Sequence, residues 1–109
     1  MTELGDLANL MGGITSGLLG EQQRVARNLV KGLVVSTVNT SDCGYETAIL
    51  DTDHARPVER YDTWEDAVRG HARWKRRART LKKVTMLGYG ELVEPENFEL
   101  QRGLTKEDL

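Results

Sequence analysis

Short stretches rich in β-branched residues dominate the middle of the chain. Residues 33–40 read LVVSTVNT, residues 45–51 read YETAILD, and residues 58–61 read VERY, the last two with side chains alternating between two sets. β-Branched residues and a period of two are typical of strands, so we expect three strands. The turn-forming residues 41–44, SDCG, predict that the first two strands form an antiparallel hairpin.

A long helical pattern follows. The Thr63 hydroxyl can cap its first turn, and Glu65 and Asp66 lie where the helix dipole favours negative charge. Apolar side chains recur at helical spacing, and we expect this stripe to pack on the sheet: Trp64, Ala67, Val68, His71, Trp74, Ala78 and Leu81. Helix packing is assigned above all to Trp64, Ala67, His71 and Trp74. Gly70 weakens the helix unless close approach to a strand or neighbour needs the missing side chain. Packing by itself would accept alanine in place of Gly70 or His71, so neither residue is explained.

The N-terminal part of the chain has a different composition. Five of the eleven glycines lie within residues 1–20. Five apolar residues there share one face of a helix: Leu4, Leu7, Met11, Ile14 and Leu18. We expect an assembly arm that orders only against another surface, the alternative being a disordered terminus. Residues 21–31 are rich in helix formers, and Gly32 is well placed to end a short helix.

The C-terminal part is acidic. Residues 84–93 fit either a short strand or a loop, and Pro95 and Gly103 interrupt the segment that follows. We therefore expect little regular structure in residues 91–109.

These elements predict an α+β fold, in which a small antiparallel three-stranded sheet is packed by one long, basic, amphipathic helix. The chain divides into an N-terminal arm with a short helix at residues 1–32, a β-β-β-α core at residues 33–90 and an acidic tail at residues 91–109. With 109 residues, one Phe, two Trp and three Tyr, it has few large side chains for a core. We expect marginal stability alone, or help from a partner.

Charge is balanced overall but concentrated locally. The chain has 15 Lys and Arg against 17 Asp and Glu, so there is no global bias toward nucleic acid or membrane. Eight cations lie within residues 69–83: Arg69, Arg73, Lys75, Arg76, Arg77, Arg79, Lys82 and Lys83. They can contact phosphates, form a solvated face, or meet acidic protein. Six carboxylates follow in this chain: Glu91, Glu94, Glu96, Glu99, Glu107 and Asp108.

The sequence contains few signals of a metal site or a catalytic site. Asp51, Asp53 and His54 form a D-x-D-H cluster suited to a hard cation, yet the further ligands of a calcium loop are missing, and a turn rich in Asp needs no metal. His71 and Cys43 would need a third, orienting group to act as a nucleophile and base. Common nucleotide-binding and hydrolase motifs are absent. We therefore assign no catalytic residue, no metal and no cofactor, and we expect no membrane span.

Four motifs lie in the central region in a fixed order. They are Val35-Ser36-Thr37-Val38, Tyr45-Glu46-Thr47-Ala48, Arg60-Tyr61, and the E-x-A-x-x-G-H run from Glu65 to His71. This pattern resembles a group of short proteins from tailed bacteriophages, over roughly forty of the 109 residues. The chain lacks the glycine-rich loop that many of those proteins carry after the first strand, and its two ends lie outside the resemblance.

The resemblance implies a phage origin. Because small virion proteins often gain stability by packing arms into their neighbours, we expect a virion-associated structural protein of the head, connector or tail. It would be assembled in the host bacterial cytoplasm and would bind copies of itself and other virion proteins, with Trp64 and Trp74 packing on the sheet or on a neighbour. The alternative is a small phage nucleic-acid-binding protein that uses the basic helix, residues 69–83. A third reading is an enzyme using His71 and Cys43.

Overall fold

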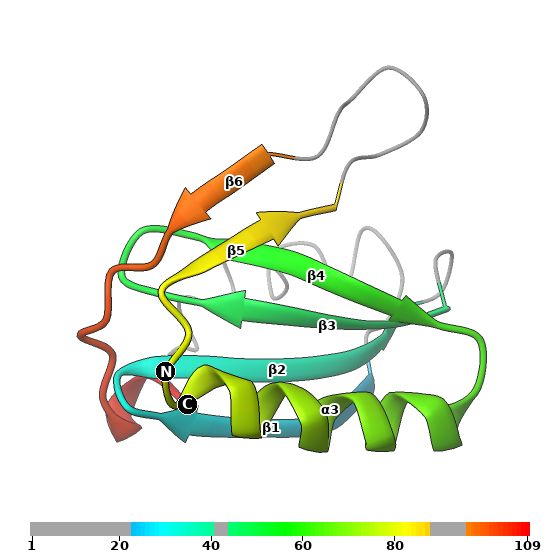
Figure 1. The fold of residues 1–109 in the computed structure, drawn as a ribbon. Coiled ribbons are helices and arrows are strands. Elements are labelled where there is room, and N and C mark those ends of the chain that lie inside the picture. Colours follow the sequence, from blue (N-terminus) through cyan, green and yellow to red (C-terminus); the bar gives the residue numbers. More distant parts are fainter. Residues whose placement is uncertain (1–22, 41–43, 88–95) are drawn as a thin grey trace.

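The computed structural model describes residues 23–40, 44–87 and 96–109, which adopt an α+β fold (Figure 1). Four antiparallel strands lie side by side in the order in which the chain forms them: β1 (Gln23–Val30), β2 (Leu33–Thr40), β3 (Gly44–Leu50) and β4 (Ala55–Tyr61). The α-helix of the described region, α3 (Trp64–Ala78), packs on one face of this sheet. A second, two-stranded sheet consists of β5 (Lys83–Met86) and β6 (Glu96–Glu99), and a 3-10 helix, η2 (Lys106–Asp108), follows.

The first strand corrects a prediction. Residues 21–31 are expected to be helical, but β1 pairs with β2, starting from the pair Val30 and Leu33. Lys31 and Gly32 both have positive φ, 50° and 84°. They form the two-residue turn of a tight hairpin, so Gly32 ends no helix. Helix propensities differ by only a few tenths of a kcal/mol per residue, and strand pairing along the whole of β1 outweighs them.

The central strands agree more closely with the prediction from the sequence. β2 has the predicted bounds and pairs antiparallel with β3, as the hairpin prediction requires. The turn residues 41–43 lie outside the described region. β4 begins at Ala55, earlier than predicted, and Val58 is an extra residue opposite the step from Thr47 to Ala48. This bulge lets the strand continue through Pro57, which is tolerated at sheet edges and bulges.

The C-terminal segment is more ordered than expected. β6 pairs with β5, and Gly103 and Leu104 donate their N–H groups to the Gly32 carbonyl. The Arg102 guanidinium donates to the carbonyls of Ala78, the last residue of α3, and of Leu81, which follows the helix. These bonds satisfy carbonyls that a helix end leaves without partners, so the segment is attached to both the helix and the β1–β2 turn.

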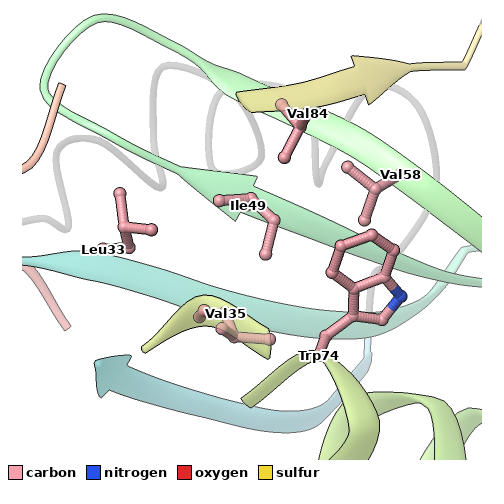
Figure 2. Packing of buried hydrophobic residues seen from close by; sticks show 7 residues of the cluster. Leu33, Val35, Ile49, Val58, Trp74 and Val84 are labelled. Carbon is pink, nitrogen blue, oxygen red and sulfur yellow. The ribbon is translucent and has the colours of Figure 1, made fainter. Parts of the chain in front are cut away.

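The hydrophobic core lies between α3, β5 and one face of the four-stranded sheet (Figure 2). The sheet contributes Leu33, Val35, Ile49 and Val58, α3 contributes Trp74 and Ala78, and β5 contributes Val84. Residues on the opposite face, such as Val34 and Leu50, are buried as well. Arg27 lies on that face and donates to Ser36 and to the carbonyl of Asp108, so η2 is held against it.

Two residues of the predicted helix stripe do not pack on the sheet. Trp64 is 53% exposed and Val68 is 38% exposed. The helix buries Ala67, Gly70, His71, Trp74 and Ala78 instead. Val68 is rotated by about 100° around the helix axis from Ala67, and Trp64 is the first residue of the helix. The assignment of Trp64 to packing on the sheet is therefore wrong, whereas that of Ala67, His71 and Trp74 agrees with their burial.

Gly70 allows α3 to approach the sheet closely. A Cβ atom built at this position would lie 2.2–2.3 Å from Oη, Cε1 and Cζ of Tyr61. No side chain fits there without displacing the ring. The expectation that packing would accept alanine at Gly70 is therefore wrong.

We predict that Gly70→Ala lowers the free energy of unfolding by about 1–2 kcal/mol. Because the added Cβ would lie only 2.2–2.3 Å from ring atoms of Tyr61, the cost falls in the upper part of the overpacking range, about 2–3 kcal/mol, of which a gain of about 1 kcal/mol in helix propensity offsets part. Urea denaturation of the single and double variants tests this. In the Tyr61→Leu background, where the ring is absent, the alanine should be neutral or stabilising. Unchanged or increased stability of Gly70→Ala alone would contradict the close packing.

Candidate functional site

Residues of the four sequence motifs meet beneath α3 in one chain of hydrogen bonds. The Oγ1 atom of Thr37 lies 2.6 Å from that of Thr47 and 2.7 Å from Nδ1 of His71. Tyr61 Oη donates to Thr47 Oγ1 at 3.0 Å, and His71 Nε2 lies 2.8 Å from Oδ1 of Asn28. Each strand of the main sheet thus contributes at least one side chain to the chain of bonds, and α3 contributes the imidazole.

The protons of this network have one consistent arrangement. Oδ1 of Asn28 can only accept, so Nε2 of His71 carries the ring proton and Nδ1 accepts from Thr37. The hydroxyl of Thr37 in turn accepts from Thr47, which accepts from Tyr61. Every buried polar atom of this network then has a hydrogen-bond partner, as is usual for polar groups that are shielded from water.

Glu59 ends the network at β4. Its carboxylate accepts from Trp74 Nε1 at 2.7 Å and from Arg73 at 2.7 and 2.9 Å. It also shares the single hydroxyl proton of Tyr61 with Thr47, with Tyr61 Oη 3.1 Å from Glu59 Oε1. Burial opposes ionisation of Glu59, but the hydrogen bonds from Trp74, Arg73 and Tyr61 outweigh it and lower the pKa of the carboxyl. Burial, together with the nearby charge of Glu59, raises the pKa of Tyr61 to about 12.

His71 is buried and neutral in this arrangement. It is 4% exposed, and both ring nitrogens have partners. Burial, and secondly the charge of Lys75, lowers the pKa of the imidazole. Because both nitrogens bind side chains of the sheet, His71 presents no free base to a substrate. The structure thus accounts for a histidine at this position, which apolar packing alone does not. Cys43, its candidate partner in catalysis, lies outside the described region.

The D-x-D-H cluster forms a turn around one carboxylate. Asp51 is 2% exposed and accepts from the N–H groups of Asp53, His54 and Gln101 and from the Arg56 guanidinium, at 2.8–3.0 Å. Burial disfavours its ionisation, but the three backbone bonds and Arg56 prevail and lower its pKa. Four donors occupy the acceptor sites of Asp51. Within the described residues, no group of three or more His, Cys, Asp or Glu is placed to hold a metal.

The structure divides the eight cations of residues 69–83 into three groups. Arg69 pairs with Asp66, Arg73 pairs with Glu59, and Arg77 stacks on the Trp74 ring at 4.1 Å. Lys82 and Lys83 lie beyond the end of α3, with Lys83 in β5, so the predicted basic helix is shorter than residues 69–83. The remaining three, Lys75, Arg76 and Arg79, line a groove.

This groove lies between α3 and the edge strand β1 and has a volume of about 480 Å³. Its apolar lining comes from Leu29, Val30 and Ala72, and its cationic lining from Lys31, Lys75, Arg76 and Arg79. No ion pair to these four cations occurs among the described residues. The exposed side chains of Trp64 and Val68 precede Ala72 at four-residue spacing, so they extend the same side of the helix. We call the groove and these two residues together the groove face.

The acidic tail does not neutralise this face in the part of the chain that the structure describes. Glu96, Glu99, Glu107 and Asp108 form no ion pair with α3 there. The contact between the C-terminal segment and the helix is made by the cation Arg102 instead. Glu91 and Glu94 lie outside the described residues, as do the five arm residues: Leu4, Leu7, Met11, Ile14 and Leu18.

Part of this site can be predicted from the sequence. Helical spacing predicts that His71 and Trp74 face the sheet, and two of the motifs contain Thr37 and Thr47. None of Thr37, Thr47 and Glu59 is assigned from the sequence to the side of the sheet that faces the helix. Their alternation within the strands is the signal that could have placed them on the helix-facing side. Asn28 was missed because its segment was predicted to be helical.

Comparisons of the chain with protein-family models, with curated proteins and with solved structures found no match. None of the described helices is long and apolar enough to cross a membrane.

We predict that His71 makes stability depend on pH. The folded state lowers the imidazole pKa below its ordinary value of 6.5, so it binds this proton less readily than the unfolded chain. The contribution of His71 is fully present above pH 6.5 and is lost as the pH falls toward the pKa of the folded state. The loss is at most about 1.4 kcal/mol per pH unit.

Urea denaturation at about pH 7.5 and about pH 5.5 measures this dependence. His71→Gln should show a smaller loss of stability on acidification than the natural protein. His54→Gln, a matched change at the exposed histidine of the Asp51 turn, should retain the full loss. An equal pH dependence in all three proteins would show that His71 is not its source.

Proposed function

We propose that this protein is a structural component of a tailed-bacteriophage particle, in the head, connector or tail, and that it acts by binding copies of itself and other proteins of the particle. The motif resemblance supports the phage origin. Thr37, Thr47, Tyr61 and His71, which belong to the four motifs, bind one another in the buried network. The shared pattern is therefore well explained as a signature of a shared fold.

The main support for a binding role is the difference between the buried network, whose polar groups already have partners, and the groove face, which is exposed. The polar side chains under α3 bind one another, whereas the groove face exposes Trp64 at the start of the helix and carries the cations Arg76 and Arg79 near its end. Tryptophan and arginine are enriched among the residues that carry binding energy at protein interfaces. This distribution favours a protein that binds over one that catalyses.

Residues 1–20 are the proposed second contact. Their five apolar side chains would anchor the chain in a neighbouring subunit, because a body this small gains stability when a partner covers it. The protein would then reside in the virion, having been assembled in the bacterial cytoplasm.

Mass spectrometry of purified particles from the encoding phage tests the proposal. We expect the protein in the particles at a constant ratio to the major structural proteins. In a phage carrying Trp64→Ser and Val68→Ser, which change exposed residues of the groove face, its amount should fall by about tenfold or more. Glu65→Ser, an exposed change on the same helical turn, is the matched control. Abundance in infected cells together with absence from particles would overturn the proposal.

Nucleic-acid binding is a second candidate, favoured by one observation. Lys75, Arg76, Arg79, Lys82 and Lys83 make no ion pair within the part of the chain that the structure describes. If all five contact phosphates of duplex DNA, the logarithm of the association constant should fall with the logarithm of salt concentration with a slope of about −4 to −5. Filter binding or fluorescence anisotropy measures this slope. A slope near zero, or no binding at low salt, would exclude this candidate.

A further inference from the structure

We infer that the groove between α3 and β1 binds an acidic, extended segment of a partner protein, which adds to the sheet as a strand beside β1. The inference rests on the proposed binding function and names the surface and the chemistry of its partner. Three features of the described residues carry it: the free edge of β1, the cations around the groove, and its apolar lining.

The edge of β1 offers backbone groups to a new strand. β1 is the first strand of the sheet, and β2 is its partner among the described strands. The two-residue turn makes Val30 and Leu33 a hydrogen-bonded pair, and such pairs alternate with non-hydrogen-bonded ones in an antiparallel ladder. The N–H and C=O groups of Leu29 therefore point away from β2. Leu29 also lines the groove, so these groups are available to a segment lying in it.

The charge around the edge selects an acidic segment. Lys75 and Arg76 from α3, Arg79 directly after it and Lys31 from the β1–β2 turn border the groove on its helix side and at its end. Alternate side chains of an added strand lie on the same face of the sheet. Carboxylates at alternate positions would therefore face α3 and its cations. The side chains between them would lie on the opposite face, beside Leu29, which pairs with Val34 there; small apolar residues fit at these positions.

The same charges disfavour a second β1 as the occupant. Arg24 and Arg27 lie in this strand and Lys31 follows it in the turn, and pairing two such edges would bring like charges together. Cations on an edge strand are a common protection against such pairing. The occupant we propose is accordingly an acidic segment of another protein rather than the same edge of a second copy.

The groove is less suited to nucleic acid. Along α3, Arg69, Arg73 and Arg77 are engaged by Asp66, Glu59 and Trp74, which interrupts the row of cations that would follow a phosphate backbone. The outward N–H and C=O groups of Leu29 and the apolar lining match a polypeptide strand better than a chain of phosphates.

A labelled seven-residue peptide of alternating Glu and Val, titrated into the full-length protein, tests the inference by fluorescence anisotropy. We expect saturable binding that Lys75→Glu with Arg76→Glu weakens by about tenfold or more. Lys82→Glu with Lys83→Glu is the matched control, because it makes the same change in net charge outside the groove. It should change the affinity by less than about threefold. Equal weakening by both pairs would mean that only overall charge attracts the peptide, and would overturn the inference.

Amide hydrogen exchange tests the strand addition itself. The bound peptide should slow exchange of the Leu29 N–H, which faces away from β2, whereas the already paired N–H of Val30 should change little. Binding without protection of Leu29 would overturn the strand geometry. A duplex DNA that binds more tightly than the peptide and protects no amide of β1 would identify the surface as a nucleic-acid site instead.

The outcomes separate this inference from the proposed function. Presence in phage particles without binding of the acidic peptide would support the proposed function and contradict the inferred binding groove. Binding of the peptide in the groove together with absence from particles would support the groove and contradict the phage structural role. Circular dichroism of each variant verifies folding, which changes at these exposed side chains should preserve.

Discussion

Burial of polar side chains between α3 and the sheet is the constraint on which the rest of this structure depends. A hydroxyl or imidazole removed from water costs free energy unless it finds a hydrogen-bond partner. Here the partners come from all four strands and the helix, from Asn28 through Thr37 and His71 to Glu59. Displacing α3 along the sheet would break several of these bonds at once. The network therefore specifies where the helix lies more narrowly than apolar packing would.

The position of the helix determines what the surface offers. With the Tyr61 ring directly against Gly70, α3 packs close to the sheet, and its outer side meets the edge of β1 in the groove. Two sets of hydrogen bonds hold the C-terminal segment: Asp51 accepts from the backbone of Gln101, and Arg102 donates to the carbonyls of Ala78 and Leu81. Arg102 also donates to the Lys31 carbonyl in the β1–β2 turn, so the helix and the turn that border the groove are joined by specific bonds.

The motif pattern and the binding surface are separate parts of the molecule. Four motif residues, Thr37, Thr47, Tyr61 and His71, lie in the buried network that holds the helix on the sheet. The groove face lies outside this network and includes Trp64, Lys75, Arg76 and Arg79. Proteins that share the motifs would therefore share the arrangement of helix and sheet without necessarily sharing a partner, because function belongs to a site and not to a fold.

The sequence by itself determined the α+β class, the β2–β3 hairpin and the start of α3 at Thr63, because alternation, turn residues and capping are local signals. Only the tertiary structure decided that residues 23–30 form a strand, that Trp64 is exposed, and that Gly70 and His71 are needed. Local propensities are small beside the pairing of β1 with β2. The need for glycine or histidine arises from partners such as Tyr61, Thr37 and Asn28, which are distant in the sequence and become neighbours only when the chain folds.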